Sequence, residues 1–183
     1  MKTILIILGV IVVIGGYIGF TFNSLVSLEE TSVAAWQQVE TQYQRRFDLI
    51  PNLVELVKGV MKQEQAIFTA LADARARYSG AVSTNDKVAA ASDVESALSR
   101  LLVVVENYPV LKSSDTVQTL MSQMEGTENR ISVERSRFNE TVRVYNLKTK
   151  RFPSSIVAAI FGFDEKAYFE ATQGAEKAPT VAL

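Results

Sequence analysis

The sequence predicts an all-α protein in which an N-terminal transmembrane helix is followed by an antiparallel helical bundle. Three observations support this fold class. The chain of 183 residues begins with a long apolar run that carries no charge. Beyond this run, apolar residues recur at alternating steps of three and four, which is the spacing of amphipathic helices. Only four prolines and nine glycines interrupt the chain, which favours long helices over a sheet-rich fold.

The apolar run extends from Ile4 to Phe22. At about 1.5 Å per residue, a helix of this length just crosses a hydrocarbon core of roughly 30 Å. The alternative is a cleaved signal peptide, but the run is longer than a usual signal-peptide core and no small-x-small site with Ala follows it. We therefore interpret residues 1–22 as an uncleaved signal anchor that contacts the lipid bilayer through Ile4 to Phe22.

The charges that flank this segment predict its orientation. Lys2 precedes it, whereas the next basic residues along the chain are Arg45 and Arg46. Because basic residues near a membrane segment favour the cytoplasmic side, we expect a single-pass membrane protein with a cytoplasmic N-terminus, in the inner membrane if the cell is a bacterium. The bundle then lies outside, in the periplasm if the cell has two membranes.

The segment from Asn23 to Tyr78 reads as one very long amphipathic helix. We expect Pro51 to kink it near Phe47 to Ile50 or to divide it, because proline removes a backbone hydrogen bond and clashes with the preceding turn. Gly80 is placed to end it in a left-handed cap. The predicted apolar stripe consists of Trp36, Val39, Tyr43, Phe47, Ile50, Val54, Val57, Met61, Phe68, Leu71 and Tyr78.

Two further long helices are predicted. The second begins at a cap within Thr84 to Asp86 and runs to about Tyr108, where Pro109 stops it. Its inward positions are Val88, Ala91, Val94, Leu98, Leu101, Val105 and Tyr108. The third begins near Ser113 to Asp115, with Gln118 completing an Asp115 capping box, and reaches about Arg151. Its inward positions are Val117, Leu120, Met124, Ile131, Phe138, Val142 and Tyr145.

The C-terminal part contains a short apolar helix and a tail. Ile156 to Phe161 form the helix, which Gly162 closes, so the predicted bundle domain covers residues 23–162. Ile156 to Phe163 is too short to span a membrane; it either lies on a membrane surface or closes the bundle, and we favour the second. Residues 163–183 have no helical period and are predicted to be an extended tail, partly packed through Tyr168 and Phe169.

Composition excludes several function classes. The balance of 19 basic and 20 acidic residues argues against nucleic-acid binding, which needs a basic face. The absence of Cys and His removes thiol catalysis, common zinc sites and most general-base arrangements. A di-iron bundle site would also need His, so we expect no metal and no cofactor, and we interpret Glu40, Asp48, Glu55 and Glu64 as surface acids.

Two polar clusters are candidate binding sites. Arg45, Arg46 and Asp48 precede Pro51, and the stretch Thr127 to Arg130 contributes Glu128 and Arg130. Each cluster is either part of a ligand site or a set of structural ion pairs, and helical spacing favours the second. No Ser or Lys has an evident activating partner, so we expect a protein that is not an enzyme.

The difference in helix lengths predicts an interface. The second helix covers less than half of the first, so the membrane-proximal stripe must be covered by the third helix, by the short helix or by another copy of the chain. We therefore expect a homo-oligomer, or docking of another envelope protein, through apolar residues of the first helix, namely Leu25, Leu28, Val33, Trp36, Val39, Tyr43 and Phe47.

The chain also resembles the LemA family of bacterial membrane proteins. The resemblance rests on LVSLEETSVAAWQQVETQYQRRFDLIPNLVELVKG, ENYPVLKS, GTENRISVERSRFNETVRVYN, RFPSSIVAAIFGF and APTV, which occur in this order. Where the family favours Tyr, this chain has Phe138, and its ending TVAL also departs from the family pattern. The resemblance implies a transmembrane helix followed by an antiparallel bundle, and it implies no established enzymatic activity.

These observations lead to two functional expectations. The first is a non-enzymatic, single-pass envelope protein whose bundle self-assembles or docks a partner at the membrane surface. The alternative is a ligand- or peptide-sensing module of the envelope that uses polar groups near Arg45, Arg46, Glu128 and Arg130. A pocket between helices lined by these residues would favour the alternative.

Overall fold

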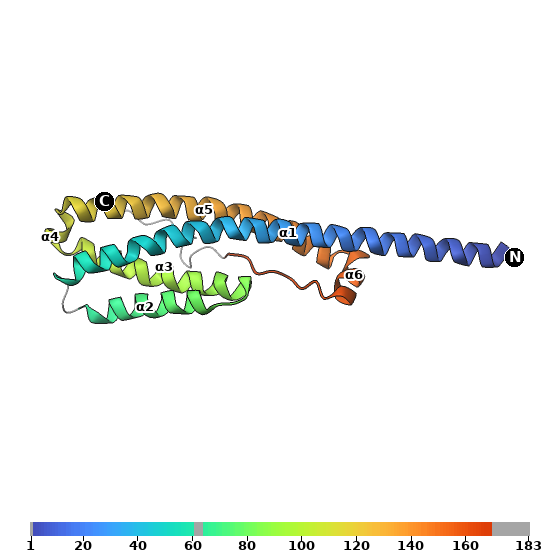
Figure 1. The fold of residues 1–183 in the computed structure, drawn as a ribbon, viewed down its shortest axis with the longest axis horizontal. Helices are drawn as coiled ribbons and strands as arrows, with labels where there is room; N and C mark the ends of the chain where they lie inside the picture. The colour runs from blue at the N-terminus through green and yellow to red at the C-terminus, as the bar shows by residue number, and fades with distance from the viewer. Residues whose placement is uncertain (1, 61–63, 170–183) are drawn as a thin grey trace, which may run out of the picture.

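The computed structural model describes residues 2–60 and 64–169, and all of their regular structure is helical (Figure 1). The all-α fold class is therefore confirmed. The long helices are α1 (Lys2–Lys58), α2 (Gln65–Gly80), α3 (Thr84–Glu106) and α5 (Asp115–Lys150). Two short helices, α4 (Pro109–Lys112) and α6 (Ser154–Phe161), precede and follow α5. The predicted stripe residue Met61 and the part of the predicted tail from 170 to 183 lie outside the described residues.

The four long helices alternate in direction and lie side by side as an antiparallel bundle (Figure 1). α1 packs along α5, and α2 packs along α3. One core cluster joins all four, and it includes Trp36 and Leu53 of α1, Leu71 of α2, Leu98 of α3 and Ile131 of α5. Burial of such side chains contributes about 1.5–3 kcal/mol each, which explains why the three-and-four spacing places the helices correctly.

The predicted division of the first long helix at Pro51 is wrong. α1 continues through Pro51 to Lys58, and the chain then reverses into α2. Pro51 is exposed, so the carbonyl that loses its hydrogen bond can face water, while Ile50 and Leu53 on either side of it are buried. The packing of these apolar residues outweighs the cost of the proline. The stretch predicted as one helix from Asn23 to Tyr78 is thus two antiparallel helices.

The N-terminal part of α1 extends beyond the bundle as a lone helix (Figure 1). Its apolar window is long enough to cross a membrane, and none of that window is buried inside the protein. The first buried residue of α1 is Thr21, and the first buried apolar residue is Leu25, which packs against Val157 and Ala158 of α6. Near this point α1 changes from a helix exposed on all sides to the central helix of the bundle.

Helix ends follow the predictions in part. Ser83 caps α3 by accepting a hydrogen bond from the Asp86 backbone N–H at 3.0 Å, and Gly162 closes α6 in the left-handed region at φ 72°. Gly80 does not form the predicted left-handed cap, because α2 ends in an extended Ala81. The predicted Asp115 capping box is also absent: Ser114 is the N-cap of α5, and the Gln118 amide donates to the Lys112 carbonyl at 2.8 Å.

After α6 the chain is extended from Phe163 to Phe169 and runs back along the bundle (Figure 1). Phe169 is buried in the core cluster, whereas Tyr168 is 42 % exposed. The expectation of a tail packed through both aromatic residues is therefore correct for Phe169 and wrong for Tyr168. Side chains in an extended segment point alternately to opposite sides, so two neighbouring rings cannot both face the core.

Candidate functional site

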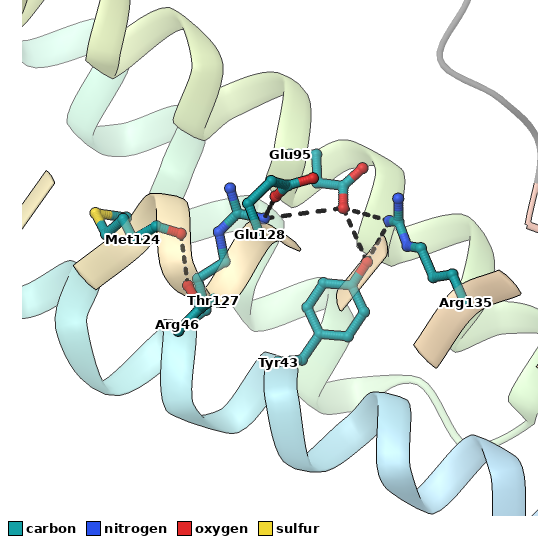
Figure 2. Close-up of polar contacts among 7 residues, drawn as sticks. All are labelled: Tyr43, Arg46, Glu95, Met124, Thr127, Glu128 and Arg135. Carbon is teal, nitrogen blue, oxygen red and sulfur yellow. Dashed lines mark hydrogen bonds and ion pairs between the residues drawn. The ribbon is translucent and has the colours of Figure 1, made fainter. Parts of the chain in front are cut away.

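A buried polar network crosses the middle of the bundle and joins α1, α3 and α5 (Figure 2). The Tyr43 hydroxyl donates to Glu95 Oε1 at 3.0 Å. Arg135 Nη2 donates to both the Tyr43 oxygen and Glu95 Oε1. Arg46 Nη1 forms an ion pair with Glu128 and lies 3.9 Å from Glu95 Oε1. One carboxylate, that of Glu95, thus faces two guanidinium groups and one phenol.

The network is nearly closed to solvent on the α1 side. The side chain of Arg46 is 7 % exposed and that of Glu95 is 19 % exposed, whereas Glu128 is 45 % exposed and forms the solvent end. Burial, and then the charge of Glu95, raise the pKa of Tyr43 far above its usual value. Burial lowers the pKa of Arg135, but Tyr43 and Glu95 more than reverse this effect and raise it. Tyr43 therefore stays neutral and Arg135 stays charged.

This arrangement ties three helices together. Both guanidinium groups and the Tyr43 hydroxyl approach the same oxygen of Glu95, Oε1. Arg135 also lies over two aromatic rings, 5.6 Å from the Tyr43 centroid and 4.5 Å from the Phe169 centroid, so cation–π attraction fixes it further. The geometry is that of a cross-link between helices.

The structure brings together two of the five polar residues that the sequence singled out, Arg46 and Glu128. Arg45 and Arg130 are exposed and point away from the network, and Asp48 accepts a hydrogen bond from Gln44 at 2.9 Å on the surface of α1. The predicted structural ion pair therefore exists, but it joins α1 to α5 across the bundle. Of the four groups considered for a sensing module, Arg45, Arg46, Glu128 and Arg130, only Arg46 and Glu128 form a pair, because a helix directs neighbouring side chains about 100° apart.

Sequence reasoning missed the two residues that complete the network, Glu95 and Arg135. Glu95 lies directly after the inward-facing Val94, and Arg135 lies three residues before Phe138, so both stand beside the apolar stripes of their helices. A charged residue beside an apolar stripe is the available signal. Helical spacing alone cannot pair them, because it contains no information about which helices are neighbours.

The predicted interface on α1 is largely used inside the chain itself. Leu25, Trp36, Val39, Tyr43 and Phe47 are buried against α6, α5, α2 and the extended segment, so they are not available to a partner in this fold. Leu28 is partly buried and Val33 is 37 % exposed. The five buried residues are occupied within the chain because α6 covers Leu25, the segment that follows α6 covers Trp36, and α2 covers Tyr43 and Phe47.

A second candidate site is the groove that holds this extended segment. The Asn139 side chain donates to the Phe169 carbonyl and accepts from the Phe169 N–H, each at 2.9 Å. Asn146 makes the same pair of bonds with Lys166, at 2.9 and 3.0 Å. Seven residues on a helix rise about 10.5 Å, and three residues of an extended chain span about 10 Å, so the two amides match the repeat of an extended peptide.

Side chains anchor the same segment at both ends. The Phe169 ring stacks on Trp36 with 5.8 Å between centroids and meets Phe138 edge-on at 5.7 Å. At the other end, Lys166 forms an ion pair with Glu29 at 3.1 Å and lies 5.2 Å from the Tyr145 ring centroid. We call this site, made by Asn139, Asn146 and these aromatic and acidic side chains, the strap groove. Trp36 was predicted as an interface residue and Phe169 as a packed one, but the site that they form with Asn139 and Asn146 was not predicted.

Other features of the described residues carry less chemistry. No group of three or more acidic side chains that could hold a metal lies together in residues 2–60 and 64–169. Glu40, one of the acids considered above, forms an ion pair with Lys87 of α3. A shallow hollow between the end of α1 and the start of α5 is lined by Asn52, Glu55, Asp115 and Thr119, none of which belongs to the polar network.

Comparison with known proteins places the chain in a family. The family model described as LemA family matches residues 35–183. Magnetosome proteins MamQ 1 and MamQ 2 of Paramagnetospirillum magneticum are each 28% identical over 175 residues, covering 81% of this chain and 64% of the relative. Magnetosome protein MamQ of Magnetospirillum gryphiswaldense is 28% identical over 174 residues with the same coverage. The chain thus spans less than two thirds of these relatives. It belongs to the LemA family.

Proposed function

We propose that this protein is a non-enzymatic, single-pass envelope protein whose bundle self-assembles as a scaffold or docks a protein partner at the membrane surface. The observation that carries the proposal is α1, one uninterrupted helix from Lys2 to Lys58. Its first part is exposed and apolar, and the remainder is a central helix of the bundle. Because this helix is continuous, it fixes the position of the bundle relative to the membrane span.

The polar interior of the bundle supports a structural role. The Tyr43 hydroxyl and the Arg135 guanidinium both donate to Glu95, so one carboxylate ties α1, α3 and α5 together. Buried ionic networks of this type fix the register of packed helices more than they add stability. A bundle held in one register and anchored by a continuous helix suits a protein that presents a fixed surface to others.

The proposed orientation places the N-terminus in the cytoplasm and the bundle outside the inner membrane. It rests on Lys2, the basic residue that flanks the membrane segment. The chain has no Cys, so a single cysteine reports on one position alone. In Val82→Cys, whose parent side chain is 94 % exposed between α2 and α3, a membrane-impermeant maleimide should label intact spheroplasts. Labelling that requires lysis would reverse the orientation.

Self-assembly has to use apolar residues that the chain leaves exposed. On the bundle part of α1, near the membrane, Val26 is 36 % exposed and Val33 is 37 % exposed. They lie seven residues apart, so they share one face of the helix, with the partly buried Leu28 also on this part of α1. This spacing is typical of a helix that packs along a second helix, here that of another copy.

Light scattering in mild detergent tests this interface. The full-length protein should form a discrete assembly well above the 20.2 kDa chain mass, and the double variant Val26→Glu with Val33→Glu should reduce the mass to one chain. The matched control is Val82→Glu with Val110→Glu, at exposed valines of the α2–α3 turn and of α4. A wild-type protein that is already a monomer, or a double variant with unchanged mass, would contradict self-assembly through this face.

The alternative, a peptide-sensing module, is favoured by the strap groove. Side-chain amides that hydrogen-bond to the backbone of an extended segment recognise its extended conformation and place little restriction on its side chains. A protein lacking residues 163–183 should then bind the synthetic peptide FDEKAYFE, and Asn139→Ala with Asn146→Ala should weaken this binding strongly. Absence of peptide binding by a folded truncated protein would remove the alternative.

A further inference from the structure

We propose that the outward face of α6 is a membrane-docking surface that enters the lipid bilayer beside the span. This inference rests on the membrane span of the proposed function. The occupant is the bilayer itself, contacted by apolar side chains that the fold leaves uncovered next to the membrane segment of α1.

The position of α6 along α1 determines how far α6 lies from the centre of the bilayer. Its inner face packs through Val157 and Ala158 against Leu25, with Ile18 and Phe22 beside them. The Phe22 ring meets the Phe161 ring with 4.9 Å between centroids. Ile18 and Phe22 belong to the last turn of the apolar run, within about 6 Å of its end. If that run spans the membrane, α6 lies level with the outer edge of the hydrocarbon core.

The outward face of α6 has the composition of a lipid-facing surface. Ile156 is 53 % exposed, Ile160 68 % and Phe161 49 %, and Phe152 in the preceding turn is 81 % exposed. The helix sequence SSIVAAIF contains no charged residue. A short helix that is apolar on both faces has no side that favours water, whereas a surface helix of a soluble bundle is polar on its outer face.

α5 provides the comparison within the same molecule. Its outer face carries the ion pairs Arg137–Glu134 and Arg143–Glu140, whose charged groups favour water. The α5–α6 turn then places the exposed Arg151 directly before Phe152. A basic residue beside an exposed aromatic ring is typical of the interfacial region, where the ring enters the lipid and the charge stays among head groups.

The bilayer is favoured over a second copy because the exposed face of α6 is continuous with the span. α6 contacts α1 at Phe22, and the apolar window of the same helix is 0% buried in the protein. A surface that covers the end of the span at Phe22 therefore also lies beside Phe161. A lipid bilayer does this without a matching protein surface, since it solvates both with the same acyl chains.

Site-directed spin labelling of the full chain in vesicles of phosphatidylcholine and phosphatidylglycerol tests the proposal. Each protein carries one cysteine, at Ile160, at Val13 in the apolar run or at Val110 in α4, and these parent residues are 68 %, 72 % and 70 % exposed. Oxygen partitions into lipid, whereas a water-soluble nickel chelate does not. The label at Ile160 should show an oxygen-to-nickel accessibility ratio several-fold above that at Val110 and close to that at Val13. Ile156→Cys should give the same result.

The other outcomes each overturn the proposal in a recognisable way. Strong nickel accessibility at Ile160, equal to that at Val110 while Val13 stays in lipid, would show that α6 faces water although the span is correct. Protection of the Ile160 label from both reagents would show that protein, and hence another copy, covers this face. Nickel accessibility at Val13 would remove the span, and this inference with it.

Discussion

The substitution Glu95→Gln tests the role of the buried network most sharply. It keeps the size of the side chain and removes its charge, so Arg135 and Arg46 lose the carboxylate between them. Arg46 retains Glu128, but Arg135 retains only the Tyr43 hydroxyl and the aromatic rings. A buried guanidinium without a carboxylate keeps its desolvation cost and loses its compensation.

The magnitude follows from burial. Removing one partner of a buried ion pair costs about 3–5 kcal/mol, and the 19 % exposure of Glu95 with 16 % for Arg135 favours the lower end. We therefore expect a loss of about 3 kcal/mol in the free energy of unfolding. For a chain of this size, where about 1 kcal/mol lowers Tm by 2–4 °C, this is roughly 6–12 °C.

Fluorescence of Trp36, the single tryptophan of the chain, reports on unfolding because it is buried in the core. The assay is thermal and urea unfolding of the full chain in mild detergent. The matched control is Asp93→Asn on the same helix. The Asp93 side chain is 51 % exposed, so its ion pair with Arg77 should contribute less than about 1 kcal/mol. If Glu95→Gln shifts Tm no more than Asp93→Asn does, the network does not hold the bundle together.

Three further predictions concern single groups. Asn139→Ala removes two backbone hydrogen bonds of Phe169, about 2 kcal/mol together, so the Phe169 amide should exchange with deuterium roughly 30-fold faster, while Glu140→Ala should not change it. Tyr78→Phe should leave the free energy of unfolding unchanged or raise it, because the buried hydroxyl has no hydrogen-bond partner among the described residues; a loss above about 1 kcal/mol would contradict this. Burial, assisted by nearby acids, raises the pKa of Tyr145 to about 12. The stability that comes from keeping Tyr145 neutral is fully present below pH 10 and is lost as pH rises through about 12. In Tyr145→Phe, the free energy of unfolding measured with urea should therefore fall less between pH 9 and 11.5 than in the wild-type protein.

The apolar pattern of the sequence predicted most of the core, although the predicted Val54 is only partly buried and its neighbour Leu53, which was not predicted, is completely buried. Every inward position predicted on α5 is buried, from Val117 to Tyr145, because a helix three turns or longer repeats its faces regularly. The start of α3 was predicted one residue late: the cap was expected within Thr84 to Asp86, whereas Ser83 is the N-cap and Thr84 is the first helical residue. Local rules succeed where the structure depends on neighbours in sequence.

Features that depend on distant contacts were not predictable in the same way. The cost of Pro51 could be known, but the packing of Leu53 and Ile50 that outweighs it depends on the other helices. The strap groove was missed for a similar reason: Asn139 and Asn146 look like ordinary surface amides until the extended segment returns to them. Polar pairs such as Arg135 with Glu95 leave no periodic signal.

The central claim is that one uninterrupted helix joins the membrane span to the bundle. Hydrogen–deuterium exchange of the full chain in lipid nanodiscs tests it most directly at the junction, from Phe22 to Thr31. Continuous α-helical hydrogen bonding predicts slow exchange through this stretch, comparable with that near the buried Trp36 and Tyr43. A fast-exchanging break between Phe22 and Thr31 would show that span and bundle are separate units, and it would contradict the account.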